Sequence, residues 1–195
     1  MLRDEGVIKF DCKWDKQPIP IEWDSTLLIS TRQKLYQAKL IGAYEDNIGF
    51  GNISIRVPDS DQFIISGSST GNLPQLSRSD FSLVLSADIN KNKVSCVGET
   101  IASSESMTHA TIYQHDKTIN AIVHAHHKQI WNNLLNKVPT ISEKISYGTP
   151  DMAKATQNIM DHQGQIFCMA GHEDGIVAYS ESLERAAFLL LRLTE

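Results

Sequence analysis

The sequence has few cysteines and no basic cluster, and each absence excludes a class of function. Among 195 residues there are three cysteines, Cys12, Cys96 and Cys168, widely spaced and without a CxxC pair. This pattern argues against a disulfide framework and against a thiolate zinc site, so we expect reduced thiols in a cytoplasmic protein. The net charge is -5 and no block of Lys or Arg occurs, so neither nucleic acid nor an anionic membrane is an expected partner.

Long apolar runs are also missing. No segment approaches the roughly 20 apolar residues that a membrane span requires. The N-terminus, MLRDEGVIKFDCKW, has mixed charge in place of the apolar core of a signal peptide. Hydrophobic residues still make up 41% of the chain, which is typical of a soluble globular domain. A domain of this length can bury roughly 70% of its unfolded surface without a disulfide or metal staple.

The hydrophobic pattern predicts a mixed α/β domain. Residues 1–26 contain Pro18 and Pro20 and predict an irregular N-terminal arm with one short strand, and residues 27–195 predict a single domain. Helices are expected at 27–44, from Ser103 or Ser104 to about 115, at 128–135, from Pro150, and at 181–194. Strands are expected at 53–57, 62–66, 81–88, 94–97, 119–126, 165–172 and 175–180. This order predicts a central mixed sheet with helices on both faces.

The strongest local signal is the HAHH sequence at 124–127. Residues two apart in a strand project from the same face, so His124 and His126 can contact one metal ion, whereas His127 points away. Catalytic zinc needs three protein ligands, often imidazoles, and an open position. His172 follows another apolar strand and is the best candidate for the third ligand.

Ordinary roles remain open for these histidines. His115, His127 and His162 are interpreted as helix-start or solvated residues. For the same-face pair, spacing alone leaves metal binding and a hydrogen-bonded core pair equally open, because buried imidazoles need polar partners in either case. Two other HxH architectures are excluded. An amidohydrolase barrel needs about 250 residues, and a cupin barrel needs all-β patterning and a nearby carboxylate ligand.

Two polar segments are candidates for binding an anion. Ser103 and Ser104 precede a predicted helix, whose N-terminus favours anions, and Glu105 and His109 share one face of that helix. Simple capping by either serine is the alternative. Gly51-Asn52 and the loop SGSSTGN at 66–72 offer glycines and hydroxyls for a phosphate, although ordinary turns explain them equally well.

Taken together, these motifs resemble the class II aldolase/adducin family over roughly residues 27–193. The motifs occur in the family's order: GNIS (51–54), STG (69–71), SSE followed by a histidine (103–109), VHAH (123–126), GT (148–149) and an apolar strand ending at His172. The resemblance implies a three-layer αβα sandwich with a mixed, mainly antiparallel sheet. It also implies a homo-oligomer, with a tetramer favoured, whose active sites lie at subunit interfaces.

The resemblance further implies the roles of individual residues. His124, His126 and His172 would bind Zn2+ or another divalent metal, and Glu105 would act as acid/base beside it. The phosphate of a sugar substrate would be held by Gly51, Asn52, Thr70, Gly71, Ser103 and Ser104. The late motif departs from the family because GHEDG inserts Glu173 and Asp174 after His172. A proton-donating tyrosine from the neighbouring subunit has no counterpart in register; Tyr147 is the nearest.

This set of residues predicts a lyase of carbohydrate metabolism. Zinc would polarise a ketone oxygen and its neighbouring hydroxyl oxygen, and would stabilise the enediolate formed when a phosphorylated ketose is cleaved by retro-aldol chemistry. Epimerisation, sugar-phosphate dehydration and decarboxylation of a hydroxy-keto acid reuse the same chemistry and remain alternatives. A non-catalytic, adducin-like interaction domain is a further alternative.

Overall fold

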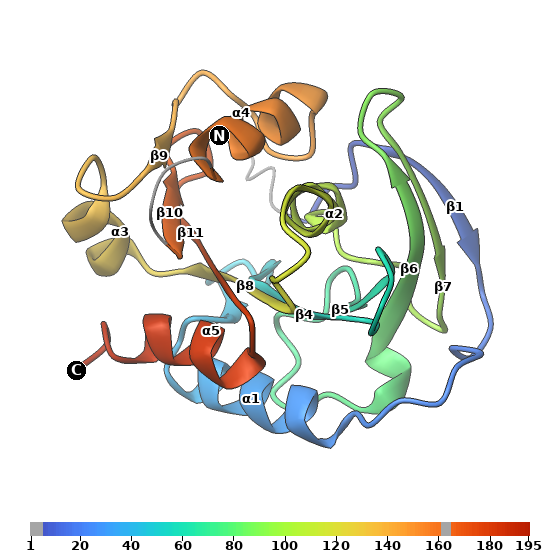
Figure 1. Cartoon of the computed structure of the whole chain (residues 1–195). Coiled ribbons are helices and arrows are strands. Elements are labelled where there is room, and N and C mark those ends of the chain that lie inside the picture. Colours follow the sequence, from blue (N-terminus) through green and yellow to red (C-terminus); the bar gives the residue numbers. More distant parts are fainter. Residues whose placement is uncertain (1–5, 161–164) are drawn as a thin grey trace.

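A nine-stranded mixed sheet forms the centre of the molecule (Figure 1) within residues 6–160 and 165–195, the part of the chain that the computed structural model describes. Its strand order is β1-β7-β6-β5-β4-β8-β11-β10-β9. Neighbouring strands are antiparallel except for the parallel pairs β1 with β7 and β9 with β10. The predicted mixed, mainly antiparallel sheet is therefore confirmed.

The strands follow the apolar segments of the sequence. The central sheet contains β1 (Asp11–Asp15), β4 (Asn52–Arg56), β5 (Phe63–Ser66), β6 (Phe81–Asp88), β7 (Lys93–Val97), β8 (Ala121–His126), β9 (Thr140–Ile141), β10 (Ile166–Met169) and β11 (Gly175–Ser180). A small separate ribbon pairs β2 (Gly42–Ala43) with β3 (Gly49–Phe50). Every residue of β8 and of β11 is buried, so both strands are apolar along most of their length instead of alternating with polar residues.

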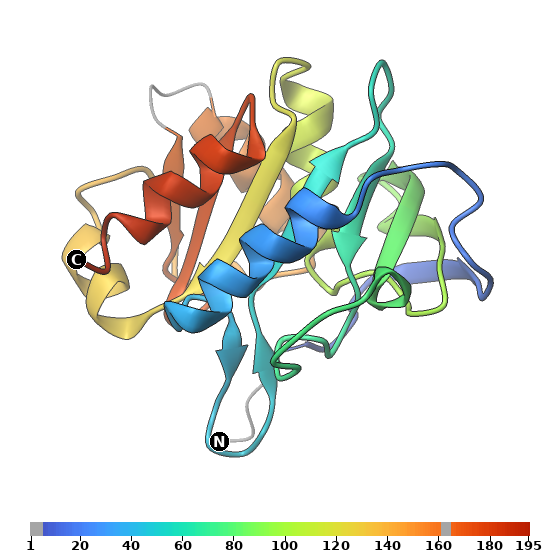
Figure 2. The ribbon, with the colours of Figure 1, turned by 90° about the horizontal axis from the view of Figure 1, so that it is seen from below.

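Helices cover both faces of the sheet and complete three layers (Figures 1 and 2). Helices α1 (Thr26–Gln37) and α5 (Leu183–Leu191) pack on one face, and α2 (Ser106–His115) and α4 (Pro150–Met160) pack on the other. The short helix α3 (Lys128–Leu134) and the 3-10 turn η1 (Arg78–Asp80) lie in connections between strands. None of the described helices has the length and hydropathy needed to cross a membrane.

The first helix is shorter than the predicted 27–44, and that prediction is wrong at its C-terminus. Helix α1 ends at Gln37, and Lys39 adopts a left-handed conformation with φ 58°. The backbone N–H of Leu40 then donates to the carbonyl of Leu35 at 2.9 Å, which closes the helix in a Schellman motif. Glycine usually occupies the left-handed position, so a lysine there left no stop signal in the sequence.

The serines at 103 and 104 precede helix α2 and do not cap it, which corrects the capping interpretation. Helix α2 begins at Ser106 with Glu105 at the N-cap position and no side-chain cap hydrogen bond. The hydroxyl oxygen of Ser103 accepts from the backbone N–H of Glu105 at 3.2 Å. Both serine side chains therefore lie in the connection between β7 and α2.

Strand β1 lies within the segment predicted as an N-terminal arm. It adds an edge strand to the sheet beside β7, and the indole N–H of Trp14 donates to the carbonyl of Gly98 at 2.9 Å. The Sγ atoms of Cys12 and Cys96 lie 3.7 Å apart across these two strands, and both thiols are free, as is that of Cys168. The first five residues of the arm fall outside the described residues, as does His162.

Candidate metal centre

Strand β8 carries two histidines on one face near its C-terminal end. It lies between β4 and β11, with His124 opposite Asn52 and His126 opposite Gly175. The next residue, His127, begins helix α3, where its ring Nδ1 accepts from the backbone N–H of Ile130 at 3.4 Å. His127 therefore has the helix-start role expected of it.

A third histidine completes a buried cluster with these two. His172 follows β10, and its ring centroid lies 5.1 Å from that of His124 and 4.6 Å from that of His126. One potential ligand nitrogen from each ring lies within 4.8 Å of the other two. A tetrahedral zinc ion needs nitrogen-to-nitrogen separations of about 3.4 Å, given Zn–N bonds of about 2.1 Å. Small side-chain rotations would therefore bring all three rings to one ion.

The protonation state of His124 suits a metal ligand. Complete burial holds the pKa of His124 well below its usual range, and the neighbouring rings of His126, His172 and His109 lower it further. The ring is neutral and keeps a lone pair at neutral pH. Neither of its nitrogens has a hydrogen-bond partner among the described residues. Buried polar atoms are costly without a partner, and a divalent ion bound by three neutral imidazoles would supply one.

A carboxyl group faces the same space. Glu105 is 1% exposed, and its Oε1 lies 3.6 Å from Nδ1 of His172 while its Oε2 lies 3.9 Å from Nδ1 of His124. Because His124 is neutral, its contact with Glu105 is not an ordinary ion pair. The carboxyl is close enough to reach either a metal ion in the cluster or a substrate bound to that ion.

Two tyrosines support the cluster, and no sequence motif pointed to the first of them. The hydroxyl of Tyr44 lies 2.8 Å from Nδ1 of His126, which leaves Nε2 of that ring to face an ion. Tyr147 stacks on His172 with ring centroids 4.5 Å apart and an interplanar angle of 22°. The ammonium group of Lys9 lies 3.9 Å from the ring centroid of Tyr147. Tyr147 thus contacts a candidate ligand from within the same chain.

The segments expected to hold a phosphate are adjacent to one another. Gly67 pairs with Ala102, which brings the loop containing Thr70 and Gly71 next to Ser103 and Ser104. The backbone N–H of Ser68 donates to the carbonyl of Ile101 at 2.8 Å in the same contact.

The third segment, Gly51-Asn52, lies against the histidines. Gly51 has φ 77°, and a Cβ there would lie 3.0 Å from the carbonyl oxygen of His124, so only glycine fits. Asn52 is buried and pairs with His124 in the sheet. Of the predicted phosphate residues, Gly51 and Asn52 therefore lie directly beside His124.

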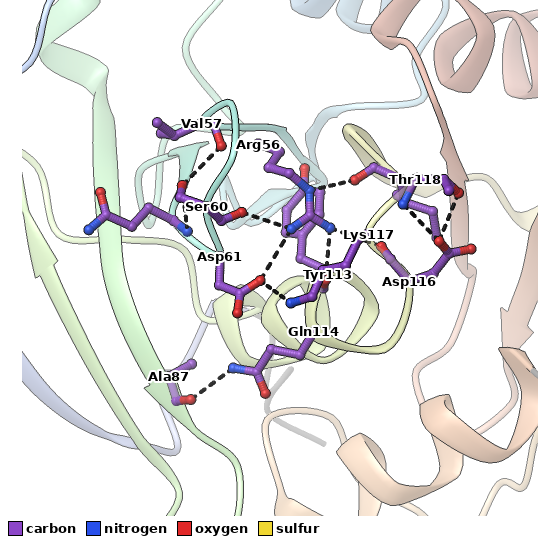
Figure 3. A network of polar contacts seen from close by, with 12 residues as sticks. Arg56, Val57, Ser60, Asp61, Ala87, Tyr113, Gln114, Asp116, Lys117 and Thr118 are labelled. Carbon is purple, nitrogen blue, oxygen red and sulfur yellow. Dashed lines mark hydrogen bonds and ion pairs between the residues drawn. The ribbon is translucent and has the colours of Figure 1, made fainter.

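A hollow of about 850 Å³ lies elsewhere in the described part of the molecule, and Arg56, Asp61 and Lys117 are among its lining residues. Arg56 ends strand β4 at the opposite end from Asn52, so this hollow is remote from the histidines. Figure 3 shows that the Arg56 guanidinium already donates to surrounding carbonyl groups, which leaves it unsuited to hold a ligand.

Comparison with known proteins agrees with this architecture. The sequence model described as Class II Aldolase and Adducin N-terminal domain matches residues 28–195. No curated protein sequence matches the chain significantly.

Several solved structures share the fold. An L-fuculose 1-phosphate aldolase superposes with a TM-score of 0.66 at 24% identity, over 87% of this chain and 80% of that one. L-fuculose-1-phosphate aldolase from Thermus thermophilus gives 0.58 at 21% identity, over 85% and 86%. A sugar-phosphate aldolase from Thermotoga maritima gives 0.62 at 15% identity, over 86% and 90%.

Proposed function

The chain belongs to the class II aldolase and adducin family, and from that premise we propose that it is a zinc-dependent lyase that cleaves a phosphorylated ketose by retro-aldol chemistry. The observation that carries the proposal is the buried cluster of His124, His126 and His172 with the Glu105 carboxyl facing the same space. The sugar-phosphate aldolases of similar fold support the choice of substrate class.

The three histidines would hold the ion through neutral ring nitrogens. When bound, zinc supplies Lewis acidity toward a carbonyl oxygen and its neighbouring hydroxyl oxygen. Tyr44 orients His126, and the packed ring of Tyr147 restrains His172. These contacts keep the ligand nitrogens turned toward a common centre before the metal arrives.

Glu105 would transfer a proton to or from the substrate. Its carboxyl lies beside two of the candidate ligands and is shielded from water, so it can exchange a proton with a substrate hydroxyl or carbon placed next to the ion. Thr70, Gly71, Ser103 and Ser104, with Gly51 and Asn52, would bind the phosphate of the same substrate. Binding energy from that remote group then orients the carbon–carbon bond that breaks.

A retro-aldol screen tests the proposal. Purified protein would be incubated with a panel of ketose 1-phosphates, with and without a chelator, while triose phosphate release and bound zinc are measured. We expect chelator-sensitive release that Glu105→Gln abolishes. Glu99→Gln removes an exposed carboxyl from the same connection between β7 and α2 and should keep the activity.

Two outcomes would contradict the lyase assignment in different ways. Zinc bound at one ion per chain without triose phosphate release from any sugar would favour the epimerase, dehydratase or decarboxylase reactions. Absence of bound metal in protein purified without chelator would instead favour an adducin-like interaction domain. We further propose a cytoplasmic homo-oligomer, with a tetramer favoured, which light scattering on a sizing column would test.

A further inference from the structure

A buried arginine stands behind the candidate phosphate turn. Arg32 on helix α1 is 1% exposed, and its Nη2 donates to the carbonyl oxygens of Thr70 at 3.0 Å and of Gly71 at 2.9 Å. Its Cζ lies 4.7 Å from the ring centroid of Tyr36. Its Nη1 is buried and has no hydrogen-bond partner among the described residues. Within residues 6–160 and 165–195, no carboxylate forms an ion pair with it.

Arg56 shows how the same fold satisfies another buried guanidinium (Figure 3). Arg56 donates to four backbone carbonyls and forms an ion pair with Asp61 at 3.4 Å. Arg32 has two carbonyl acceptors and, among the described residues, no carboxylate in direct contact; Asp80 acts on it only through a longer-range charge interaction. Burial lowers the pKa of Arg32 to about 10, so its side chain remains charged at neutral pH. A buried guanidinium with one unpaired nitrogen and no direct ion pair is incompletely compensated, so an anion bound nearby would stabilise it.

The geometry of the turn shows where that anion would bind. In a trans peptide group the C=O and N–H bonds point in opposite directions. The carbonyls of Thr70 and Gly71 both point at Arg32, so the N–H groups of the same two peptides, on Gly71 and Asn72, point away from it. No described group accepts a hydrogen bond from either N–H. Two adjacent outward N–H groups with a positive charge behind them form an anion-binding arrangement.

The turn has little freedom to rotate these groups away. A Cβ on Gly71 would lie 2.6 Å from the backbone nitrogen of Phe50 and 2.8 Å from the carbonyl oxygen of Gly42, so the turn packs closely against the β2–β3 ribbon. Leu73 also donates its backbone N–H to the carbonyl of Thr70 at 3.1 Å. The backbone orientation is therefore set jointly by the ribbon and by Arg32.

We propose that Arg32 is a positioning residue for the substrate's phosphate, holding the Thr70–Gly71 turn with its N–H groups outward and supplying the positive charge that the phosphate neutralises. Arg32 does not touch the phosphate itself, because the turn lies between them. This inference rests on the proposed function, because it takes the Thr70–Gly71 turn as the phosphate subsite. It adds the positive charge of Arg32 to a subsite for which the sequence indicated only hydroxyl and backbone N–H donors.

Binding of inorganic phosphate tests the proposal without catalysis. Calorimetric affinity and bound zinc would be measured for the unaltered protein, Arg32→Met, Arg32→Lys and the matched control Lys34→Met, which removes an exposed charge from the same helix. We expect about tenfold weaker phosphate binding in Arg32→Met, corresponding to loss of one charge-assisted interaction. Arg32→Lys should lose less, the control should lose nothing, and zinc content should stay the same in all four proteins.

Kinetic measurements distinguish a role of Arg32 in positioning the phosphate turn from a general role in stabilising the fold. In Arg32→Met the KM for the phosphorylated ketose should rise about tenfold, while kcat/KM for the unphosphorylated sugar stays within about twofold. Unchanged phosphate affinity, or equal losses for both sugars, would overturn the proposal. A failure of the aldolase assignment would appear separately, as missing activity in the unaltered protein with phosphate binding intact.

A second measurement covers the case in which Arg32→Met does not fold. Hydrogen exchange of the backbone amides would be followed in the unaltered protein and in Arg32→Lys, with and without inorganic phosphate. Phosphate should slow exchange at Gly71 and Asn72 in the unaltered protein, and slow it less in Arg32→Lys. Equal protection in the two proteins, or none in either, would contradict a role for Arg32.

Discussion

At the level of single residues, the contact between Tyr44 and His126 predicts an effect on zinc binding. The Tyr44 hydroxyl and Nδ1 of His126 are 2.8 Å apart, so the tyrosine orients the ring, and a hydroxyl that accepts from Nδ1–H would leave the Nε2 lone pair for a metal. We predict that Tyr44→Phe weakens zinc binding by roughly 10- to 100-fold, the usual effect of losing a partner of a metal ligand. Competition with a chromophoric chelator would measure it. Tyr36→Phe is the matched control, and equal affinity in the two variants would contradict the prediction.

His109 predicts a pH dependence of stability. Burial lowers the pKa of His109 to about 3, and its Nδ1 lies 2.7 Å from the hydroxyl of Ser54. The folded protein therefore leaves this ring neutral, whereas the unfolded chain protonates it below pH about 6.5. The unfolded state then binds more protons, so the free energy of unfolding falls as pH drops below that value. His109 alone would contribute a loss of about 2 kcal/mol at pH 5, at about 1.4 kcal/mol per pH unit.

Replacing this histidine separates its contribution from that of other buried groups. His109→Asn keeps a polar atom near the position of Nδ1 but cannot titrate. Urea unfolding at pH 7 and pH 5 should show a smaller difference between the two pH values in this variant than in the unaltered protein. An identical difference in both proteins would mean that His109 does not contribute.

At the level of elements, the C-terminus of helix α1 has a strained backbone conformation that a substitution can relieve. Lys39 has φ 58° at the position where a Schellman motif usually has glycine. We predict that Lys39→Gly raises the free energy of unfolding by about 0.5–1 kcal/mol, because glycine adopts this conformation without steric cost. Lys34→Gly, within the same helix, should lower it by about 1 kcal/mol. Urea unfolding of both variants measures the two changes in the free energy of unfolding. Changes of the same sign would contradict the prediction.

At the level of the whole molecule, the N-terminal segment links the sheet edge to the candidate metal centre. Strand β1 covers the edge of β7, and the Tyr147 hydroxyl contacts the backbone of Val7, with 3.2 Å to its nitrogen and 3.3 Å to its oxygen. A chain beginning at Ile19 loses both contacts. We predict a lower urea midpoint and concentration-dependent self-association, since β7 becomes an exposed sheet edge.

Zinc binding should survive this truncation, because the three histidines lie on β8 and after β10. One zinc ion per chain is therefore expected in both proteins. A chain beginning at Val7 keeps both contacts and serves as the control. An unchanged midpoint in the chain that starts at Ile19 would show that the arm adds nothing to the stability of the fold.

Local pattern was sufficient for most of the elements and for the candidate ligands. Apolar runs located the strands from β4 to β11 except the two-residue β9, and alternation along a strand put His124 and His126 on one face. Such features depend on neighbours within a few residues, where side-chain direction follows directly from backbone period. The order of the elements predicted the mixed sheet, and the place of His172 after an apolar strand made it the candidate third ligand. The family motifs added the mainly antiparallel αβα sandwich and the expected roles of Glu105 and of the phosphate residues.

Tertiary structure alone decided which distant residues support the site. Tyr44 meets His126, and Arg32 meets Thr70, only because the sheet and helix α1 bring remote segments together. Nothing near Arg32 in the sequence distinguishes it from an exposed arginine. Its burial and its lack of a direct ion pair among the described residues arise from packing against a loop almost 40 residues away. Such long-range pairings leave no periodic pattern in the sequence.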